Sequence, residues 1–307
     1  MRTAGRVVII GDARIEEIRD DLGAREFVGG AALNVAVGLA RLGFPTSLIA
    51  MVGDDSDGDH IRSYLDDYGV RLIATTGRHG TVRVASVRSP GHEPTREFNR
   101  AAKHRGIQFG AVEAHAVATA AQTIVSCFPF DDAAQTRALA KALEGAEGHV
   151  CIDPNPKGGV LRDRAEFISG FESVIANASL VKLDDDDAAV LYGASIAELR
   201  ARLVRMGVDA VMTTSGTAGA IVGAGGTVVS APISKMPGLI IDTVGAGDAA
   251  LSSVIASLLS HSPQDASQWQ EVLVTAMDVA AATCRFEGPL LRLPSALSGL
   301  GVGRFGS

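Results

Sequence analysis

Residues 242–248 read Asp-Thr-Val-Gly-Ala-Gly-Asp, and a run of Ala, Leu, Ser, Val and Ile follows to about residue 259. The run predicts a helix that begins directly after the glycines. A Gly-Ala-Gly sequence at the start of a helix leaves main-chain N–H groups uncovered and lets an anion approach them closely. Such amides suit the negative charge that builds up on a transferring phosphoryl group. Asp248, at the end of the turn, is a candidate base for an attacking hydroxyl. The alternative is a glycine-rich helix cap with an Asp at its start.

A second glycine-rich segment lies near the other end of the chain. Gly29-Gly30 precedes the Ala/Leu/Val-rich stretch 31–42, which predicts a helix that ends at Gly43. Paired glycines let a substrate approach the backbone, and Asn34 offers both a donor and an acceptor, as sugar hydroxyls need. The alternative is a tight turn with a helix cap.

Short apolar segments alternate with helical patterns along the chain. We expect a helix at 57–69, another at 132–146 and a third that begins in the acidic run Asp184–Asp187. Apolar, β-branched segments predict buried strands at 6–10, 47–53, 123–128, 149–153, 179–183, 209–214 and 219–224. This alternation predicts an α/β fold with a mostly parallel central sheet covered by helices on both faces.

One segment does not fit that alternation. Residues 81–88 and 95–100 alternate in character and flank Ser89-Pro90-Gly91, which indicates a hairpin. We therefore expect a small accessory sheet beside the main one.

Composition and charge exclude several functions. The chain has 307 residues with 28 Lys+Arg and 35 Asp+Glu, a net charge of −7, so no basic surface for nucleic acid or for an anionic membrane is expected. No signal peptide and no apolar stretch of about 18 residues occurs, so we expect a cytoplasmic protein. The three cysteines lie beside apolar residues, which indicates buried thiols.

Other motifs carry no chemistry. The pattern GxGxxG at 301–306 lies at the chain end and not between a strand and a helix, so a dinucleotide oxidoreductase is disfavoured. No GxxxxGK[ST] pattern and no zinc-type spacing of histidines is present. The acidic run Asp184–Asp187 is either a calcium site or, more simply, the first turn of a helix, where carboxylates suit the dipole.

Together, the two glycine segments resemble the two signatures of the ribokinase-type (PfkB) carbohydrate kinase family. The first signature matches from Gly29 to Gly53 and the second from Asp242 to Asp248. Between and before them, four more segments resemble the family: Gly11-Asp12 after the first strand, Asp153-Pro154-Asn155 as in fructokinase-like members, Leu183–Asp187 where the family has NxxE, and Thr214–Gly219 as its TxGxxG nucleotide loop. Three departures are Asp184 and Asp187 for Asn and Glu, Ser252-Ser253 for small residues, and Lys157 for Arg.

The resemblance implies a ribokinase-like fold in a single domain, 1–307, with a small β-sheet lid from approximately 13–28 and 80–101. It implies that Asp248 is the base and that Gly245, Ala246 and Gly247 form the anion hole. It further implies sugar contacts by Asp12, Gly30 and Asn34, with Phe98 and Arg100 as further candidates, a nucleotide site at Thr214, Gly216 and Gly219, and Mg²⁺ held through water by Asp184 and Asp187. ATP and Mg²⁺ are the implied cofactors, with a monovalent cation (K⁺) near Asp242 as a family habit. A homodimer through the lid is another such habit.

The expected function is an ATP-dependent sugar kinase that phosphorylates a hydroxymethyl hydroxyl of a small sugar, most like the fructokinases. Ribokinase and 2-keto-3-deoxygluconate kinase are the alternatives in the same class. A catalytically silent sugar-binding sensor is the alternative from another class. The partners expected are a small sugar and ATP.

Overall fold

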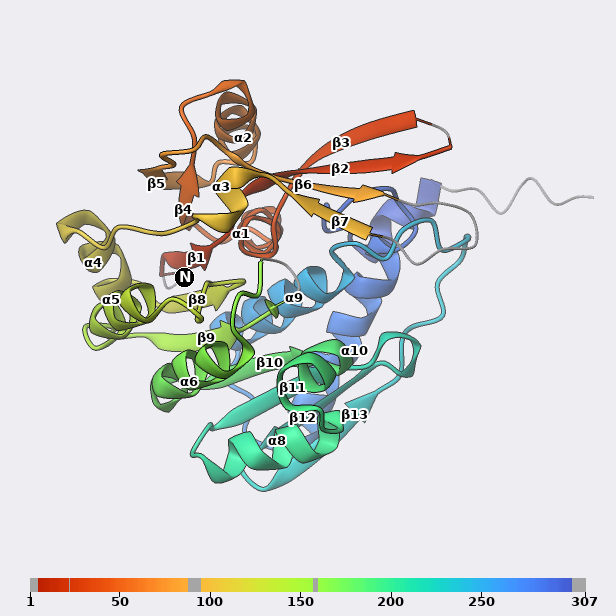
Figure 1. Ribbon diagram of the computed structural model, residues 1–307. Helices are drawn as coiled ribbons and strands as arrows, with labels where there is room; N and C mark the ends of the chain where they lie inside the picture. Colours follow the sequence, from red (N-terminus) through yellow and green to blue (C-terminus); the bar gives the residue numbers. More distant parts are fainter. Residues whose placement is uncertain (1–4, 22, 88–94, 157–159, 300–307) are drawn as a thin grey trace, which may run out of the picture.

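The computed structural model describes residues 5–21, 23–87, 95–156 and 160–299. Its first strand, β1 (Val7–Gly11), lies in the interior of the main sheet, and every residue in it is buried. Val7 and Ile9 pack on one face of the main sheet, whereas Val8 and Ile10 pack on the other. A strand that is apolar on both faces is typical of a parallel sheet between two layers of helices, and this is the arrangement in Figure 1.

Among the described residues, nine strands form the main sheet. The seven strands from β11 to β5 are parallel to one another, and β12 and β13 are antiparallel additions at one edge. In spatial order the strands are β13 (Thr227–Ala231), β12 (Ala220–Ala224), β11 (Ala210–Thr214), β10 (Leu180–Asp184), β9 (His149–Asp153), β8 (Gln122–Ser126), β1, β4 (Thr46–Val52) and β5 (Arg71–Thr76).

Helices cover both faces of this sheet, which confirms the predicted fold class. One apolar cluster joins the sheet to α1 (Ala31–Arg41), α2 (Ser56–Asp67), α9 (Ala246–Ser260) and α10 (Ala266–Thr283). A second cluster joins the opposite face to α4 (Ala111–Ala118), α5 (Ala133–Leu143), α6 (Arg164–Val174) and α8 (Ile196–Arg205). Two shorter helices are α3 (Arg100–Lys103) and α7 (Asp185–Asp187). No helix among the described residues is long and apolar enough to span a membrane.

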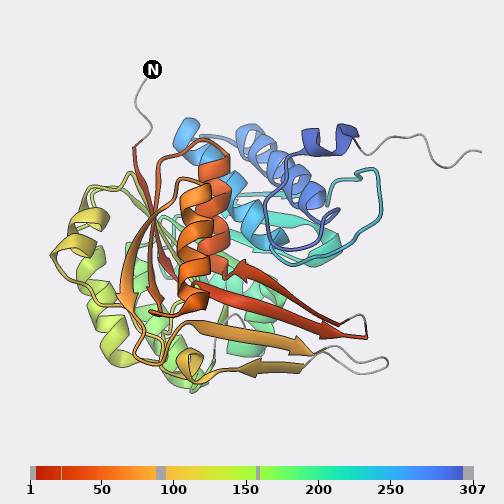
Figure 2. The same ribbon diagram turned by 90° about the horizontal axis from the view of Figure 1, so that it is seen from above.

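A second sheet begins where β1 ends. It contains β3 (Gly23–Gly29), β2 (Arg14–Asp20), β6 (Val82–Val87) and β7 (Thr95–Phe98), in that order. The β2–β6 pair is parallel, and the β2–β3 and β6–β7 pairs are antiparallel. We refer to these four strands as the small sheet; Figures 1 and 2 show it projecting from the body of the main sheet. The β6–β7 pairing confirms the predicted hairpin, whose turn at Ser89-Pro90-Gly91 lies outside the described residues.

The structure differs from the sequence-based expectations in several elements. The acidic run starts only a single helical turn, α7, and continues as a π-helical turn over Ala188–Tyr192. Strand β5 and the long helix α10 were not predicted. The periodicity of α10 is weak because apolar residues surround most of its C-terminal half, as the buried run Val279–Thr283 shows.

Helix α9 differs from its neighbours in how its N-terminus is capped. Aspartate side chains cap the N-termini of α2, α5, α6 and α10. At α1 the same role falls to Asp12, whose Oδ1 accepts the N–H of Ala32 at 3.1 Å. Helix α9 begins at Gly245 without a side-chain cap among the described residues. The N–H of Ala246 donates to the carbonyl oxygen of Thr243 at 3.2 Å, so this helix start offers the next amide, that of Gly247, to a ligand.

Candidate active site

Two adjoining cavities lie at the C-terminal ends of the main-sheet strands. The first, about 560 Å³, is bordered by β10, β11, α9 and α10. The second, about 390 Å³, lies between the small sheet and the start of α9. Both are lined by Lys182, Asp184, Asp186, Thr243 and Gly247. Polar and charged groups therefore gather where the cavities meet.

The turn before α9 separates the cavities, and its shape depends on glycine. Gly245 has φ 78°, a left-handed conformation, and a β-carbon there would lie 2.6 Å from the carbonyl oxygen of Pro289. Asp242 braces the turn, because its Oδ1 accepts the N–H of Val244 and its Oδ2 accepts the N–H of Gly288, each at 3.1 Å. The three predicted residues Gly245, Ala246 and Gly247 thus lie together at the uncapped start of α9, where an anion is favoured.

Asp248 lies on the first turn of α9 and lines the second cavity. Its Oδ2 accepts a hydrogen bond of 2.8 Å from Nδ2 of Asn34 on α1. Burial raises the pKa of Asp248 to about 7, an effect that the Asn34 hydrogen bond and Lys182 partly offset and that Asp153 and Asp12 reinforce. A carboxyl group with a pKa near the working pH suits a general base. The structure therefore brings the two predicted residues Asp248 and Asn34 into direct contact.

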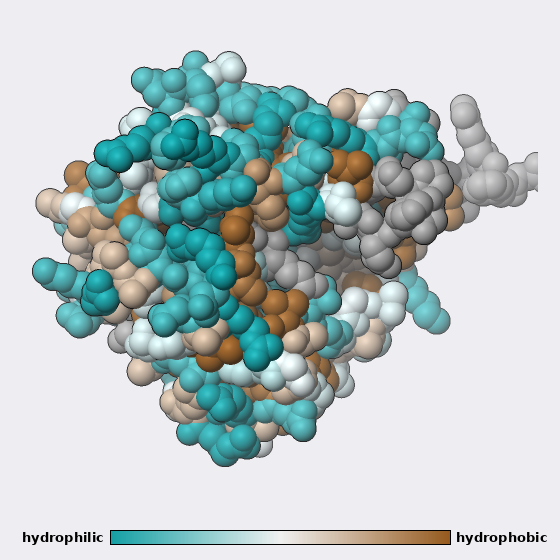
Figure 3. All heavy atoms as spheres, viewed as in Figure 1, coloured by the Kyte–Doolittle hydropathy of each residue, from teal (hydrophilic) through white to brown (hydrophobic). Residues whose placement is uncertain are grey.

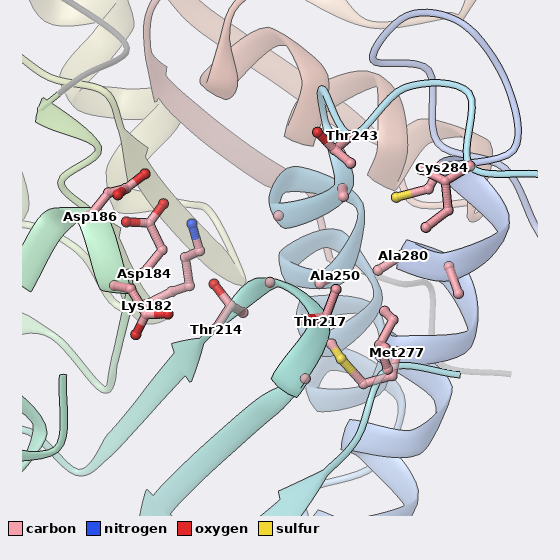
Figure 4. Close-up of a pocket in the computed structure, with 18 of the residues that line it drawn as sticks. Lys182, Asp184, Asp186, Thr214, Thr217, Thr243, Ala250, Met277, Ala280 and Cys284 are labelled. Carbon is pink, nitrogen blue, oxygen red and sulfur yellow. The ribbon is translucent and has the colours of Figure 1, made fainter. Parts of the chain in front are cut away.

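Lys182 is a site residue that the sequence reasoning missed. It lies on β10, is 4% exposed, and its Nζ is 3.2 Å from Oδ1 of Asp153. Asp153 in turn accepts a 2.8 Å hydrogen bond from Oγ of Ser126 on β8. Figure 4 shows the lysine amine beside the Asp184 and Asp186 side chains. The signal in the sequence was a single lysine inside the otherwise apolar strand Leu180–Leu183.

The ammonium group of Lys182 stays charged despite its burial. Burial acts to lower its pKa, but Asp153, Asp187, Asp184 and Asp248 together raise the pKa above the ordinary lysine value. A β-carbon built on Gly247 would lie 3.5 Å from Nζ. A permanent positive charge therefore lies beside the turn 245–247 at the start of α9.

The first cavity combines a polar end with an apolar wall. Thr214, Gly216 and Gly219, all predicted for a nucleotide, line it from the β11–β12 turn. The turn requires glycine, since Gly219 has φ 93° and a β-carbon there would lie 2.1 Å from the carbonyl oxygen of Ala231. The opposite wall comes from the loop before α9 and from α9 and α10, and its apolar residues are Ile233, Ile240, Ala250, Met277, Ala280 and Ala281. Figure 4 shows Thr214 and Thr217 facing Met277 and Ala280 across the space.

The acidic turn divides its residues between the cavities and the interior. Asp184 and Asp186 line both cavities. Asp187, which was predicted to steer a metal, is 2% exposed; its Oδ2 accepts the N–H of Asp184 at 2.9 Å. Burial and the charge of Asp184 raise its pKa well above the usual range, although Lys182 acts in the opposite direction. Asp186 thus takes the cavity-facing place expected of Asp187. No group of three metal-ligating side chains occurs among the described residues.

Of the residues predicted to contact a sugar, Asn34 lines the second cavity, whereas Asp12, Gly30 and Arg100 do not. The Asp12 carboxylate is used to cap α1 and to form an ion pair with Arg14, and Asp12 does not line this cavity. Gly30 packs against Asp12, because a β-carbon there would lie 2.9 Å from the Asp12 carbonyl oxygen. Arg14 and Glu16 line the cavity instead, with Nη2 and Oε1 2.7 Å apart. Arg14 and Glu16 are two residues apart on β2, so their side chains point to the same face of the small sheet. The sequence contains this spacing, but the prediction did not include these two residues.

The structure does not bring Arg100 to either cavity. Asn99 caps α3, its Oδ1 accepting the N–H of Ala102 at 3.0 Å, and Arg100 is exposed at the start of that helix. Phe98 packs against Val82 and Val84. Arg96 on β7 and Ser86 on β6, which pair across the small sheet, line the second cavity. Asn155 also lines it, whereas Lys157 lies outside the described residues.

The serines of α9 are accommodated by backbone bonds. Oγ of Ser252 donates to the carbonyl oxygen of Asp248 at 2.7 Å, and Oγ of Ser257 donates to that of Ser253 at 3.0 Å. Ser252 also faces Gly38 of α1, where a β-carbon would lie 2.6 Å from its Oγ. The Ser252 hydroxyl therefore fits inside the contact between α1 and α9 and lines neither of the two cavities.

Comparisons with known proteins agree with this arrangement. The family model described as pfkB family carbohydrate kinase matches residues 6–295. Fructokinase from Klebsiella pneumoniae is 28% identical over 305 residues, which cover 94% of this chain and 96% of that protein. The fructokinase structure from Vibrio cholerae O395 with fructose, ADP and calcium ion aligns with a TM-score of 0.81 at 22% identity, covering 97% of this chain and 99% of that one. Arabidopsis thaliana ribokinase complexed with ribose and ATP aligns with a TM-score of 0.76 at 17% identity, covering 97% and 98%. These alignments confirm the ribokinase-like fold.

The buried pair of Lys182 and Asp153 gives a first testable prediction. Lys182→Met should lower the free energy of unfolding by about 3–5 kcal/mol, because Asp153 would be left buried without its partner. Urea unfolding followed by circular dichroism measures the change. The control is Lys141→Met on the exposed side of α5, which should stay within about 0.5 kcal/mol of the wild type. A Lys182→Met protein as stable as the control would show that the pair does not hold this edge of the sheet together.

Proposed function

Because the chain belongs to the pfkB family of carbohydrate kinases, and is thus a phosphotransferase that acts on a sugar hydroxyl, we propose that it transfers the γ-phosphoryl group of ATP to a hydroxymethyl hydroxyl of a small sugar. Fructose is the first candidate, since relatives along the whole chain, including the Klebsiella pneumoniae protein, are fructokinases. The observation that carries the proposal is the position of Asp248 and the turn 245–247, between a cavity with an apolar wall and a polar cavity under the small sheet.

The nucleotide would lie in the first cavity. The apolar wall on α9 and α10 suits a base, and the β11–β12 turn with Thr214, Gly216 and Gly219 suits its sugar and phosphates. The γ-phosphoryl group would then lie at the start of α9, beside the amide of Gly247 and the Lys182 ammonium. Amides and a fixed positive charge aimed at the developing charge are the main source of catalysis in phosphoryl transfer.

The sugar would lie in the second cavity with its hydroxymethyl group toward Asp248. The hydroxyl oxygen forms the new bond to the γ-phosphorus, the bond to the oxygen that bridges to the β-phosphorus breaks, and Asp248 receives the hydroxyl proton. Asn34 orients the carboxylate, while Arg14 and Glu16 offer a donor and an acceptor to the remaining hydroxyls.

A divalent cation fits the acidic turn. Asp184 and Asp186 line both cavities next to the proposed phosphate position, and Mg²⁺ is usually held by one or two carboxylates together with substrate phosphates and waters. We propose Mg²⁺ there; when bound it would neutralise charge on the phosphates. Asp187 would act behind it by fixing Asp184 through their reciprocal hydrogen bonds. The monovalent cation near Asp242 stays a prediction.

The charges around the second cavity favour an uncharged sugar. Basic and acidic groups line it unequally: Arg14, Arg96 and Lys182 against Glu16, Glu17, Asp184, Asp186 and Asp248. A sugar acid would bring a further negative charge close to these carboxyl groups, which repel it at short range. This supports fructose, or ribose as for a ribokinase, over 2-keto-3-deoxygluconate. The intact Asp248 and its uncapped turn argue against a silent sensor.

We also propose that the small sheet acts as a lid. Its strands β2, β6 and β7 supply lining residues to the second cavity, so its closure over a bound sugar would exclude water.

The surface of the small sheet is polar, and ion pairs such as Arg19–Glu17 and Arg83–Glu26 lie on it. On the face seen in Figure 3, hydrophilic residues dominate around α2 and the neighbouring strands. Dimerisation through the lid stays a prediction.

A sugar panel with ATP and Mg²⁺ tests the function. ADP release should be highest with fructose, and Asp248→Asn should lower kcat by about 10²–10⁴-fold because the base is lost, with sugar binding by calorimetry largely kept. The control Asp209→Asn changes an exposed aspartate away from both cavities and should leave kcat unchanged. If no sugar gives ADP above background, the kinase proposal is wrong; if Asp248→Asn stays active, the base is another group.

The pH dependence of kcat gives a separate prediction. The active form has Asp248 ionised, so kcat should fall below a pKa of about 7, tenfold for each pH unit in the limit. The Asn34 hydrogen bond stabilises the ionised form, so Asn34→Ala should move the acidic limb to higher pH as well as weakening activity. Rates measured from pH 5 to 9 at saturating substrates check both. An acidic limb at the ordinary carboxyl range, near pH 4, in both proteins would contradict the assignment.

A further inference from the structure

Residues 287–289, which we name the bridging segment, follow α10 and touch the small sheet on one side. Nε of Arg25 on β3 lies 2.9 Å from Oε1 of Glu287. The ring of Phe27, also on β3, lies against Gly288: a β-carbon there would be 3.0 Å from Cδ1 of the ring. Gly288 has φ 82°, so its backbone conformation favours glycine as well. Charged and apolar contacts therefore tie this segment to the edge strand of the small sheet.

On its other side the same segment touches the turn 242–247 that precedes and begins α9. The N–H of Gly288 donates to Oδ2 of Asp242 at 3.1 Å. Pro289 packs so closely on Gly245 that a β-carbon at Gly245 would lie 2.7 Å from the Pro289 Cα. Oδ1 of Asp242 accepts the N–H of Val244, so one carboxylate links the segment to the turn itself. A shift of the bridging segment would thus be passed to the start of α9.

The contact on β3 is also close to the sugar cavity. Phe27 is the cross-strand partner of Glu16 in the β2–β3 ladder, and Glu16 lines the second cavity. Directly opposed residues in antiparallel strands share a face of the sheet and pack side by side. A substrate that contacts Glu16 on β2 therefore acts on the β2–β3 pair, and Phe27 on β3 packs against Gly288.

We propose that Phe27, through the bridging segment, is a positioning residue for phosphoryl transfer: closure of the small sheet on the sugar sets the position of the turn 245–247 and of the Gly247 amide. This rests on the proposed sugar kinase function. Tight packing makes the link stiff, since Gly245 and Gly288 leave no room for a side chain between the parts. Misplacement of a catalytic group by about 1 Å can cost about 10²-fold in rate, so small shifts of the turn matter.

Kinetics of substituted proteins give the first readout. Phe27→Ala should lower kcat by about 10–100-fold at saturating fructose and ATP, while the KM for ATP stays within about threefold. Phe27→Leu keeps an apolar contact with Gly288 and should retain most of kcat. Glu287→Gln removes the ion pair with Arg25 and should lower kcat less than Phe27→Ala. The matched control is Glu97→Gln, which breaks the 3.0 Å pair with Arg19 on the same sheet without touching the segment, and should leave kcat unchanged.

Amide hydrogen exchange gives the second readout, which needs no turnover. Peptides that cover residues 242–248 should exchange at least threefold faster in Phe27→Ala than in the wild type, but not in Phe27→Leu or Glu97→Gln. If Phe27→Ala does not fold, Glu287→Gln replaces it, with faster exchange expected at the same peptides.

The outcomes separate this inference from the function beneath it. No ADP with any sugar from the wild type, together with the expected exchange pattern, would overturn the kinase proposal and leave the structural link standing. Normal kcat and normal exchange in both Phe27→Ala and Glu287→Gln would overturn the link and leave the function intact. A loss of kcat without a change in exchange at 242–248 would also overturn it, since Phe27 would then act on the sugar alone.

Discussion

The edge of the main sheet where the two cavities lie depends on one interaction, that of the buried Lys182 ammonium group with the carboxylates around it. Asp153, Asp184, Asp187 and Asp248 all act on its buried ammonium group. Without a cation among them, these carboxylates would repel one another in a partly dehydrated space, and the pKa values of Asp187 and Asp248, which burial already raises, would rise further. Lys182 acts to lower the pKa of Asp248, so the candidate base remains available near neutral pH. The two cavities meet at the same ammonium group.

Backbone geometry supplies the second half of the site. Four helices start with an aspartate cap and α1 borrows Asp12, whereas α9 starts at Gly245 without one among the described residues. The contrast with these helices explains why a positive helix end is left for an anion at the start of α9. Asp12 does not line the second cavity, because capping α1 and pairing with Arg14 already use its carboxylate.

The sequence predicted what depends on local pattern and missed what depends on partners. The buried strand β1 and the glycines at 245 and 219 follow from strand composition and turn conformation. Asn34 and Asp248 were each predicted from the motifs that contain them, and the structure adds the hydrogen bond between them. The role of Lys182 depends on Asp153, which faces it from the neighbouring strand β9 and which no local pattern identifies. The spacing of Arg14 and Glu16 on β2 is a local pattern, but their place at the second cavity depends on how the small sheet lies against the main one. Local pattern also does not tell which carboxylate of the turn after β10 faces inward. Asp187, predicted to steer a metal, accepts the N–H of Asp184 in the interior, whereas Asp186 lines the cavity.

A crystal structure of the protein with fructose and a non-hydrolysable ATP analogue tests the central claim most directly. We expect the γ-phosphoryl group at the start of α9, at the amide of Gly247 and beside Lys182. The reacting hydroxyl should lie within about 3.2 Å of an Asp248 oxygen, the reach of a general base. A sugar bound with no hydroxyl near Asp248, or phosphates bound away from the start of α9, would contradict the account.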